Sequence, residues 1–319
     1  MARVSVIIAT YNRAHVVSEA IDSVLAQTYR DFEIIVVDDA STDNTAEVLA
    51  RYGDQIRYIR RQTNGGCAAT RNDGIRASTG EFIAFLDSDD LYEPNRLESA
   101  ISFLDKRGEY GAVYAEMLRV NPDAYPASQH WVAARGGGCS GWVFDALLEH
   151  AQIMTPAITI RREVLARVGL FDETLRSGFD SDLWWRIART TQIGYVDEIV
   201  CTYRVTPRSL CQSGSRTSGS WVRLCRKALD TYEGLTAHQR RLITQRLSAE
   251  LRLYACHLAR EGRHREARAA CLEAVQVALA AGLWVSALKG MAGFVLGRPA
   301  GETVRNLKAQ LQRVREVLR

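Results

Sequence analysis

The sequence EFIAFLDSDD, residues 81–90, contains the feature that decides the fold. Its first six residues are mostly apolar and predict a buried β-strand. Asp87 and Asp89 follow directly, so two carboxylates stand two residues apart at the carboxyl end of that strand. Carboxylate oxygens suit Mg²⁺ or Mn²⁺, which bind through one or two carboxylates plus substrate phosphates. On spacing alone Asp-x-Asp is also a common surface turn, so the rest of the chain must decide between a metal site and a turn.

The first 118 residues alternate between runs that predict strands and runs that predict helices. The strand-like runs are rich in Val and Ile and cover residues 4–9, 32–37, 56–59, 81–86 and 112–118. The helix-like runs carry apolar residues at helical spacing and cover residues 14–26, 46–52, 67–77 and 95–106. Apolar strands that alternate with amphipathic helices predict an α/β fold, with a Rossmann-like, mixed but mostly parallel sheet and helices on both faces.

Polar residues collect where these predicted strands end. The residues concerned are Thr10, Tyr11 and Asn12 after the first strand, Asp38 and Asp39 after the second, Asn64, Gly65 and Gly66 after the third, and Asp87 to Asp90 after the fourth. Ligands of open α/β sheets bind at the carboxyl ends of the strands. The alignment of four such ends therefore favours a binding site at one edge of the sheet over a chance surface.

The second part of the chain changes in character. Residues 119–141 are rich in Pro and Gly and predict a long irregular connection, either a functional lid or a plain surface excursion. Residues 152–161 predict a strand or a strand pair, 182–190 a helix and 199–204 a strand. From about residue 216 the pattern is almost purely helical. We therefore expect two domains, residues 1–215 and 216–319, the second a helical bundle or a partial tetratricopeptide-like repeat.

Composition and charge limit the function classes. The 319 residues are 47% hydrophobic and 24% charged, and the net charge of +4 fits anionic ligands but is too small to predict nucleic-acid binding. Seven cysteines without a Cys-x-x-Cys motif, and no signal peptide or membrane-spanning run, predict a reduced, cytoplasmic protein. Residues 277–297 are apolar and predict either a buried helical hairpin or, with the basic tail after Arg298, a peripheral contact with the inner face of the membrane.

Taken together, these motifs resemble glycosyltransferase family 2, a family of inverting enzymes with the GT-A fold. The resemblance covers residues 3–208 and includes the Arg71-Asn72-x-Gly74 stretch that follows the two glycines. It implies that the nucleotide-sugar is bound by Thr10, Tyr11, Asn12, Asp39, Gly65, Gly66, Arg71, Asp87 and Ser88.

The resemblance also implies roles for several of these residues. Tyr11 is expected to stack on the nucleotide base, with Thr10 in the same pocket. Asp39 is expected to bind the base or the ribose, and Arg71 the pyrophosphate or the base side. The glycines at 65 and 66 would let the backbone approach the nucleotide closely.

The metal site implied by the resemblance contains Mn²⁺ or Mg²⁺. Asp89 is the expected direct ligand, and Asp87 a ribose or second metal contact. Asp90 is expected to cap the following turn. Many relatives have a His where this chain has Thr206, so the cation would rest on Asp89, the diphosphate and water.

The catalytic base implied by the resemblance is Asp180. The family has a Glu-Asp pair before an aromatic-rich helix, and here Phe179 stands in place of the Glu. Asp182 is the alternative base, although an acid at a helix N-terminus also has a structural reason. Trp184 and Trp185 are expected to be one core residue and one wall of the acceptor cleft. For Arg186 a structural alternative is a helix-stabilising ion pair.

The sequence therefore predicts a metal-dependent inverting glycosyltransferase that moves a sugar from a nucleoside-diphosphate sugar, with UDP the expected carrier, to a hydroxyl of a saccharide, lipid-linked or other acceptor. A role in bacterial polysaccharide or glycoconjugate synthesis is expected, without nucleic-acid partners. A sugar-nucleotidyltransferase is disfavoured because the segment after the first strand lacks the Gly-rich signature of those enzymes. A non-catalytic nucleotide-sugar binding or scaffold protein stays open because of Phe179 and Thr206.

Overall fold

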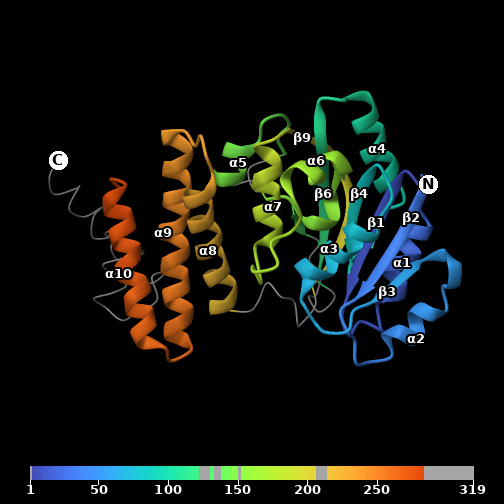
Figure 1. Cartoon of the computed structure of the whole chain (residues 1–319), viewed down its shortest axis with the longest axis horizontal. Coiled ribbons are helices and arrows are strands. Elements are labelled where there is room, and N and C mark those ends of the chain that lie inside the picture. The colour runs from blue at the N-terminus through green and yellow to red at the C-terminus, as the bar shows by residue number, and fades with distance from the viewer. Residues whose placement is uncertain (1, 122–129, 133–137, 150–151, 206–213, 284–319) are drawn as a thin grey trace. The chain divides into compact units, whose positions relative to one another are not determined.

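A computed structural model describes residues 2–121, 130–132, 138–149, 152–205 and 214–283, and the side chains of 130–132 are not part of that description. The chain divides into two compact units, Met1–Ser209 and Leu210–Arg319. Figure 1 labels most of their helices and strands. The expected boundary after residue 215 stays a prediction.

The strands of the first unit form one mixed sheet. The first four are β1 (Val4–Thr10), β2 (Phe32–Asp38), β3 (Arg57–Arg60) and β4 (Phe82–Asp87). The others are β5 (Leu91–Tyr92), β6 (Tyr110–Val120), β7 (His130–Val132), β8 (Ile158–Arg161) and β9 (Gln192–Arg204). The order across the sheet is β3-β2-β1-β4-β8-β6-β9-β5, with β7 paired to β6.

Most of the strands run in one direction. β3, β2, β1 and β4 are parallel neighbours, and β6 and β9 are parallel to each other. β8 is antiparallel to both β4 and β6, so β6 and β9 share the direction of β4. β5 and β7 run the opposite way. The expected mixed, mostly parallel sheet is confirmed.

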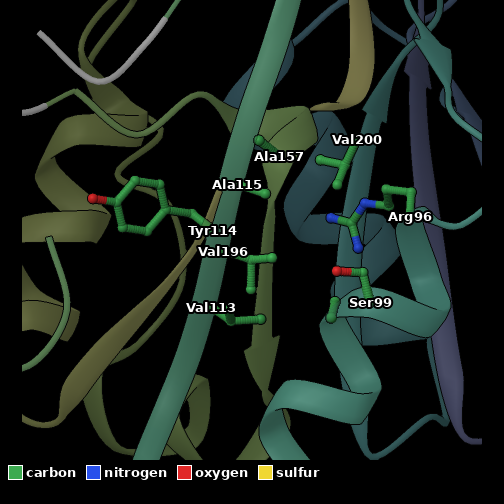
Figure 2. Close-up of a pocket in the computed structure, with 9 residues that line it drawn as sticks. Arg96, Ser99, Val113, Tyr114, Ala115, Ala157, Val196 and Val200 are labelled. Atoms are coloured by element: carbon green, nitrogen blue, oxygen red, sulfur yellow. The ribbon is translucent and has the colours of Figure 1, made fainter. Parts of the chain in front are cut away.

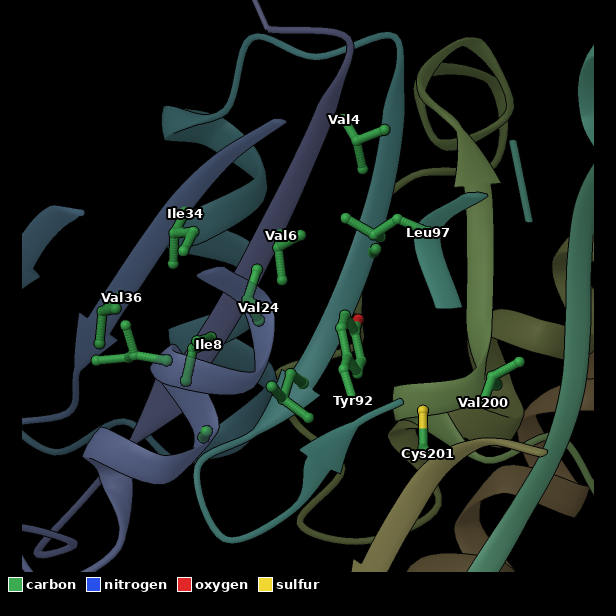
Figure 3. Close-up of a cluster of buried hydrophobic side chains, with 14 of the residues drawn as sticks. Val4, Val6, Ile8, Val24, Ile34, Val36, Tyr92, Leu97, Val200 and Cys201 are labelled. Carbon is green, nitrogen blue, oxygen red and sulfur yellow. The ribbon is translucent and has the colours of Figure 1, made fainter. Parts of the chain in front are cut away.

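Helices pack on both faces of this sheet. The helices of the first unit are α1 (Val17–Leu25), α2 (Thr45–Ala50), α3 (Cys67–Ala77), α4 (Arg96–Lys106), α5 (Phe144–Glu149), α6 (Arg162–Val168) and α7 (Phe179–Ala188), with short 3₁₀ turns at Gly53–Gln55 and Thr155–Ala157. Alternate strand residues such as Val4, Val6 and Ile8 form a core with α1, α2 and α4 (Figure 3). The central strands β1, β2 and β4 are buried on both faces along most of their length, as their almost continuous apolar sequences require.

On the opposite face, α3 lies directly against β1. A Cβ added to Gly74 would lie 2.4 Å from Cγ2 of Ile7, so no side chain fits between helix and strand. Ile7 is fully buried, and its neighbours in sequence, Val6 and Ile8, belong to the other face. The glycine therefore sets how closely α3 approaches β1.

The described part of the second unit is helical, and this expectation is confirmed. Its helices are α8 (Ser215–Thr231), α9 (Ala237–Arg260) and α10 (His264–Ala280). Helix α9 packs against both α8 and α10. It begins at Thr236, whose hydroxyl accepts the backbone N–H of Gln239 while the Gln239 side chain accepts the backbone N–H of Thr236.

Some expectations differ from the structure or fall outside it. Residues 152–161 form the single strand β8 after a 3₁₀ turn and not a strand pair, because β8 pairs with β4 and β6 on its two sides. Three expectations fall on residues that lie largely or wholly outside the described ranges. They concern the lid within 119–141, Thr206, and the apolar segment beyond residue 283. Within the described ranges, no helix combines the length and apolar character that a bilayer crossing requires.

Candidate active site

The strand ends predicted from the sequence meet at one edge of the sheet. Thr10 lies opposite Asp38 in the β1–β2 register, and Ala9 lies opposite Asp87 in the β1–β4 register. Neighbouring strands are about 4.8 Å apart. The register therefore brings the polar ends of β1, β2 and β4 side by side, as expected for a binding site at the carboxyl edge.

Asp39 orders the glycine loop between β3 and α3. Its Oδ1 accepts the backbone N–H of Gly65 at 2.8 Å and a guanidinium N–H of Arg61 at 2.7 Å. Its Oδ2 accepts the backbone N–H of Gly66 at 2.8 Å, and Gly66 has a positive φ of 84° that favours glycine. Asp39 is 3% exposed. The carboxylate thus fixes the loop at the edge of the sheet through the loop's own backbone.

The residues that follow β1 have distinct environments. Asn12 adopts a positive φ of 52°, and its Oδ1 accepts the backbone N–H of Thr42 at 2.8 Å, which joins the β1 and β2 ends. Thr10 is buried, and its hydroxyl has no hydrogen-bond partner among the described residues. Tyr11 is 44% exposed. The first loop therefore presents one aromatic ring to solvent above a buried hydroxyl.

Arg71 of α3 lies beneath this edge and is buried, with 3% exposure. Its guanidinium forms an ion pair with Asp87 at the end of β4. The guanidinium carbon also lies 5.8 Å from the ring centroid of Phe171 and 5.4 Å from that of Phe179, within the range of cation–π contacts. Burial works against the charge, but Asp87, Cys67 and Asp180 together outweigh it, so the pKa of Arg71 is raised. Arg71 therefore remains a cation in an apolar surrounding.

Asp180 lies in the first turn of α7, two residues after Gly178, which adopts a left-handed conformation. Burial raises the pKa of Asp180 above its ordinary value, although the backbone N–H of Ser181 and the charge of Arg71 lower it in part. Asp87 raises it further. The three side chains are therefore within electrostatic reach of one another. A carboxylate with a raised pKa is a better proton acceptor than an ordinary one.

Other polar and aromatic residues of α7 are structural. Asp182, the alternative base, is fully buried and pairs with Arg186 at 2.8 Å. Arg186 also donates to the backbone carbonyls of Val168 and Leu170, which supports its ion-pair reading. The expectation that one tryptophan lines an open cleft is wrong, because Trp184 and Trp185 are both almost fully buried.

The three acids at the end of β4 and just after it have two kinds of environment, one partly exposed and one buried. The side chains of Asp87 and Asp89 are partly exposed, and Nη2 of Arg13 lies 3.6 Å from Oδ2 of Asp89. Asp90 is buried, and its Oδ1 accepts the backbone N–H of Arg204 at 3.0 Å. Asp90 therefore joins the end of β4 to β9 and does not cap the following turn as expected. Burial raises its pKa well above the ordinary value.

The carboxylates at this edge provide an incomplete set of metal ligands. In the part of the chain that the structure describes, no group of three or more His, Cys, Asp or Glu side chains is placed to hold a metal ion. Asp87 and Asp89 alone supply the one or two carboxylates that Mg²⁺ or Mn²⁺ uses when phosphates and water complete the coordination. The residues therefore fit a cation that binds together with a phosphate-containing ligand.

The sequence patterns did not indicate three residues that the structure places at this site. Arg61 pairs with Asp39, and Phe171 contacts Arg71. Cys67 opens α3 near Arg71, and burial raises its thiol pKa to about 11, so the thiol is neutral at physiological pH. The position of Arg61 directly after β3 is a usable signal. The contact of Phe171, a hundred residues from α3, has no local signal.

A small hollow between α4 and strands β6 and β9 is separate from this site. It is lined by Arg96, Ser99, Ala100, Val113, Tyr114, Ala115, Ala157, Val196 and Val200. Figure 2 shows the ring of Tyr114 on the other side of β6 from Arg96 and Ser99. Arg96 is buried and donates to the carbonyls of Pro156 and Ile158. The hollow is an apolar packing defect around a structural arginine.

Comparisons with known proteins relate this chain to a family of glycosyltransferases. The model of the family described as "Glycosyl transferase family 2" matches residues 5–165. An uncharacterized glycosyltransferase of Rickettsia typhi is 34% identical over 208 residues, which are 63% of this chain and 64% of the relative. The Escherichia coli protein named UDP-Glc:alpha-D-GlcNAc-diphosphoundecaprenol beta-1,3-glucosyltransferase WfgD is 42% identical over 104 residues, 32% of this chain and 41% of the relative. The chain thus spans less than two thirds of these relatives.

Two solved structures share the fold at low sequence identity. The first is TarS 1-349 of S. aureus in complex with UDP-GlcNAc, with a TM-score of 0.68 and 18% identity over 93% of this chain and 92% of that chain. The second is the mannosyltransferase PcManGT from Pyrobaculum calidifontis in complex with GDP-Man and Mn²⁺, with a TM-score of 0.61 and 21% identity over 93% and 88%. Because the family model covers residues 5–165 of 319, about half of the sequence, the chain belongs to glycosyltransferase family 2 and has its GT-A fold.

Proposed function

We propose that this chain transfers a sugar from a nucleoside-diphosphate sugar, with UDP as the carrier, to a hydroxyl acceptor, and that the reaction needs a divalent metal and inverts the anomeric configuration. The observation that carries the proposal is the position of Asp180. Phe179, the residue before it, has its ring centroid 5.4 Å from the guanidinium carbon of Arg71, and Arg71 pairs with Asp87 at the end of β4. Burial raises the pKa of the Asp180 carboxyl.

In this proposal Asp180 takes the proton from the acceptor hydroxyl as its oxygen attacks the anomeric carbon. The bond between that carbon and the diphosphate oxygen breaks in the same step, so the configuration inverts. Asp89, with Asp87, would hold Mn²⁺ or Mg²⁺, which when bound neutralises charge on the departing diphosphate. Inversion is motivated by the sequence motifs, which give one candidate base and one metal signature and assign no second acid as a nucleophile.

The donor would lie along the edge of the sheet. Tyr11 would stack on the base above Thr10, whose buried hydroxyl lacks a partner within the described ranges. Asn12, Ser88 and the loop of Gly65 and Gly66 would line the nucleotide-sugar, with Asp39 contacting the base or ribose.

The relatives support a UDP-sugar donor and a bacterial glycan product. The name of the E. coli relative specifies UDP-Glc and a diphosphoundecaprenol-linked GlcNAc acceptor, and the TarS structure contains UDP-GlcNAc. We extend this to a saccharide or lipid-linked acceptor in polysaccharide or glycoconjugate synthesis, at or near the inner face of the membrane. The helical residues 216–319 would form a separate domain, with its tail in peripheral membrane contact.

The test is release of free nucleoside diphosphate by the purified full chain. UDP-Glc, UDP-GlcNAc, GDP-Man and dTDP-Glc are compared in Mn²⁺ and in EDTA. We expect turnover of a UDP-sugar that Mn²⁺ supports and EDTA abolishes, and a product whose anomeric configuration, read by NMR, is inverted. Retained configuration would refute the single-step mechanism, and full activity in EDTA would refute the metal requirement.

A non-catalytic nucleotide-sugar binding protein is the second candidate. The observation that favours it is Phe179, which stands where the family has an acid and is buried against Phe171. Tight, saturable binding of UDP without release of nucleoside diphosphate from any of the four donors, in the presence of octyl-linked and undecaprenyl-diphosphate-linked GlcNAc, would establish it.

A further inference from the structure

The surroundings of Arg71 leave little of its guanidinium for a ligand. One Nη donates to Asp87, and two phenyl rings lie within 6 Å of the guanidinium carbon. The side chain is 4% exposed. Its Nε has no hydrogen-bond partner among the residues described, so the group is held by one carboxylate and by aromatic faces. A guanidinium that grips a diphosphate would instead present its planar fork to the open edge.

The first ring of this enclosure is held by α3 itself. Oδ1 of Asn72 accepts the backbone N–H of Phe171 at 3.0 Å, and Nδ2 of Asn72 donates to the carbonyl of Phe171 at 2.9 Å. Asn72 is 1% exposed and directly follows Arg71. The same turn of α3 therefore carries Arg71 and holds the backbone of Phe171, whose ring faces the Arg71 guanidinium.

The second ring is Phe179, which packs edge-on against Phe171 with ring centroids 5.8 Å apart. Phe179 directly precedes Asp180 at the start of α7. A glutamate at this position would add a carboxylate beside Arg71, where it would compete with Asp87 for the cation. It would also place a like charge next to Asp180. A phenyl ring avoids both effects and still attracts the guanidinium.

We propose that Phe179 is a positioning residue: together with Phe171 it confines the guanidinium of Arg71, so that Arg71 holds Asp87 in place and does not itself contact the donor. The proposal deepens the proposed function and rests on it for the identity of the donor. It assigns Arg71 a role other than the pyrophosphate contact that the family resemblance implies.

The first experiment needs no substrate. The Asp180 carboxyl is titrated by carbon-detected NMR in the wild type and in Phe179→Leu, Phe179→Glu and Phe179→Tyr, with Asp180→Asn to assign the signal. The charged groups that act on this carboxyl are Arg71 and Asp87, and the titratable thiol of Cys67 also lies near it. We expect its pKa to rise in Phe179→Leu, because Arg71 is less confined, and to rise further in Phe179→Glu. Phe179→Tyr keeps the ring and should titrate like the wild type.

The second experiment separates positioning from donor binding. UDP affinity is measured by calorimetry in the presence of Mn²⁺, and turnover is measured with the UDP-sugar that the wild type uses. Phe179→Leu should lower kcat about threefold to thirtyfold, the range that a cation–π contact supports, with UDP affinity unchanged. Phe103→Leu is the matched control, because Phe103 has Arg107 over its ring at 4.4 Å on α4, away from this cluster. It should change neither quantity.

Two results would overturn the proposal. One is a Phe179→Leu protein that is folded and titrates like the wild type. The other is an Arg71→Met protein that loses tenfold or more in UDP affinity while the Asp180 titration stays unchanged, because Arg71 would then touch the donor. If Phe179→Leu does not fold, Phe179→Met replaces it in both measurements. A wild type that releases no nucleoside diphosphate refutes the proposed function, whereas the titration and UDP binding still decide the role of Phe179.

Discussion

One acid at the amino edge of the sheet and two acids at its carboxyl edge have pKa values that are shifted in opposite directions. At the amino edge, Glu33 of β2 accepts hydrogen bonds from the hydroxyl of Ser5 and from the backbone and hydroxyl of Thr79, at 2.6–2.8 Å. Burial works against its charge, but these bonds outweigh it and the pKa of Glu33 is lowered. At the carboxyl edge, burial raises the pKa of Asp180 and of Asp90.

The difference indicates what each edge contributes. The amino edge stabilises its carboxylate as an anion, so that edge contributes to folding. The carboxyl edge holds Asp90 and Asp180 at a cost to stability. It also contains the hydroxyl of Thr10 and the Nε of Arg71, which have no hydrogen-bond partner among the described residues. Strained or unsatisfied groups gather at functional sites because function, and not stability, selects them there.

The largest expected effect is that of Asp180→Asn. Removing the proposed base should lower turnover by about 10²–10⁴ while donor binding remains. Because the pKa of Asp180 is raised on folding, the ionised carboxylate costs stability as the pH rises through that pKa. The variant should therefore unfold at equal or higher denaturant concentration than the wild type at pH 7, and the gap should close in acid. Wild-type turnover in Asp180→Asn would remove Asp180 from the mechanism.

Next in size is Tyr11→Ala at the same edge. Loss of one base-stacking ring should weaken UDP binding by about 1–3 kcal/mol. Tyr11 is 44% exposed, so the thermal midpoint of unfolding should not change. Calorimetric titration with UDP measures the first quantity, and Tyr11→Phe is the control that keeps the ring. Equal UDP affinity in the alanine and phenylalanine variants would place the base elsewhere.

At the amino edge, Glu33→Gln should have the opposite pattern. Replacing the carboxylate by a neutral amide keeps one acceptor oxygen but removes the charge that strengthens the hydrogen bonds from Ser5 and Thr79. The change should cost about 1 kcal/mol of stability, with turnover unchanged. The pKa of Glu33 is lowered on folding, so its contribution is present above the ordinary glutamate pKa and is lost as the pH falls through the folded value. Urea unfolding at pH 7 and in acid checks both statements. A loss of turnover in a folded Glu33→Gln protein would break the contrast between the edges.

The smallest effect is expected for Arg3→Met. Arg3 pairs with Glu81 at 3.1 Å and with Asp105 at 2.6 Å, and all three side chains are at least one third exposed. Exposed pairs contribute about 0.2–1 kcal/mol. Urea unfolding should therefore show a small loss, and activity should not change.

Most strands and helices before residue 118 could be predicted because their signals are local. The helix at Cys67–Ala77 and the strands at β1, β2 and β4 follow from apolar runs and spacing, to within a residue or so. Strand β5 is only Leu91–Tyr92 and exists because it pairs with β9, more than a hundred residues later. The insertion of antiparallel β8 between β4 and β6 is equally non-local. Such pairings depend on tertiary contacts that no short segment encodes.

The sequence predicts which residues belong to the candidate site, but it does not predict which side chains and backbone groups contact them. Asp38 and Asp39 are adjacent acids at the end of β2. Asp38 is buried and accepts from the hydroxyl of Tyr58 at 3.0 Å, whereas Asp39 holds the glycine loop. Only the register and the loop geometry separate these two roles. The enclosure of Arg71 by Phe171 and Phe179 is likewise a product of the fold.

The contact of Gly74 with Ile7 has a consequence for engineering donor preference. Ile7 is fully buried, so a side chain at residue 74 would push α3 away from β1. This would displace the helix that carries Arg71. A mutant library aimed at a different sugar-nucleotide should therefore keep residue 74 constant. Variation is better placed at Tyr11, the residue proposed to stack on the base, because this residue is 44% exposed and its side chain can change without displacing α3.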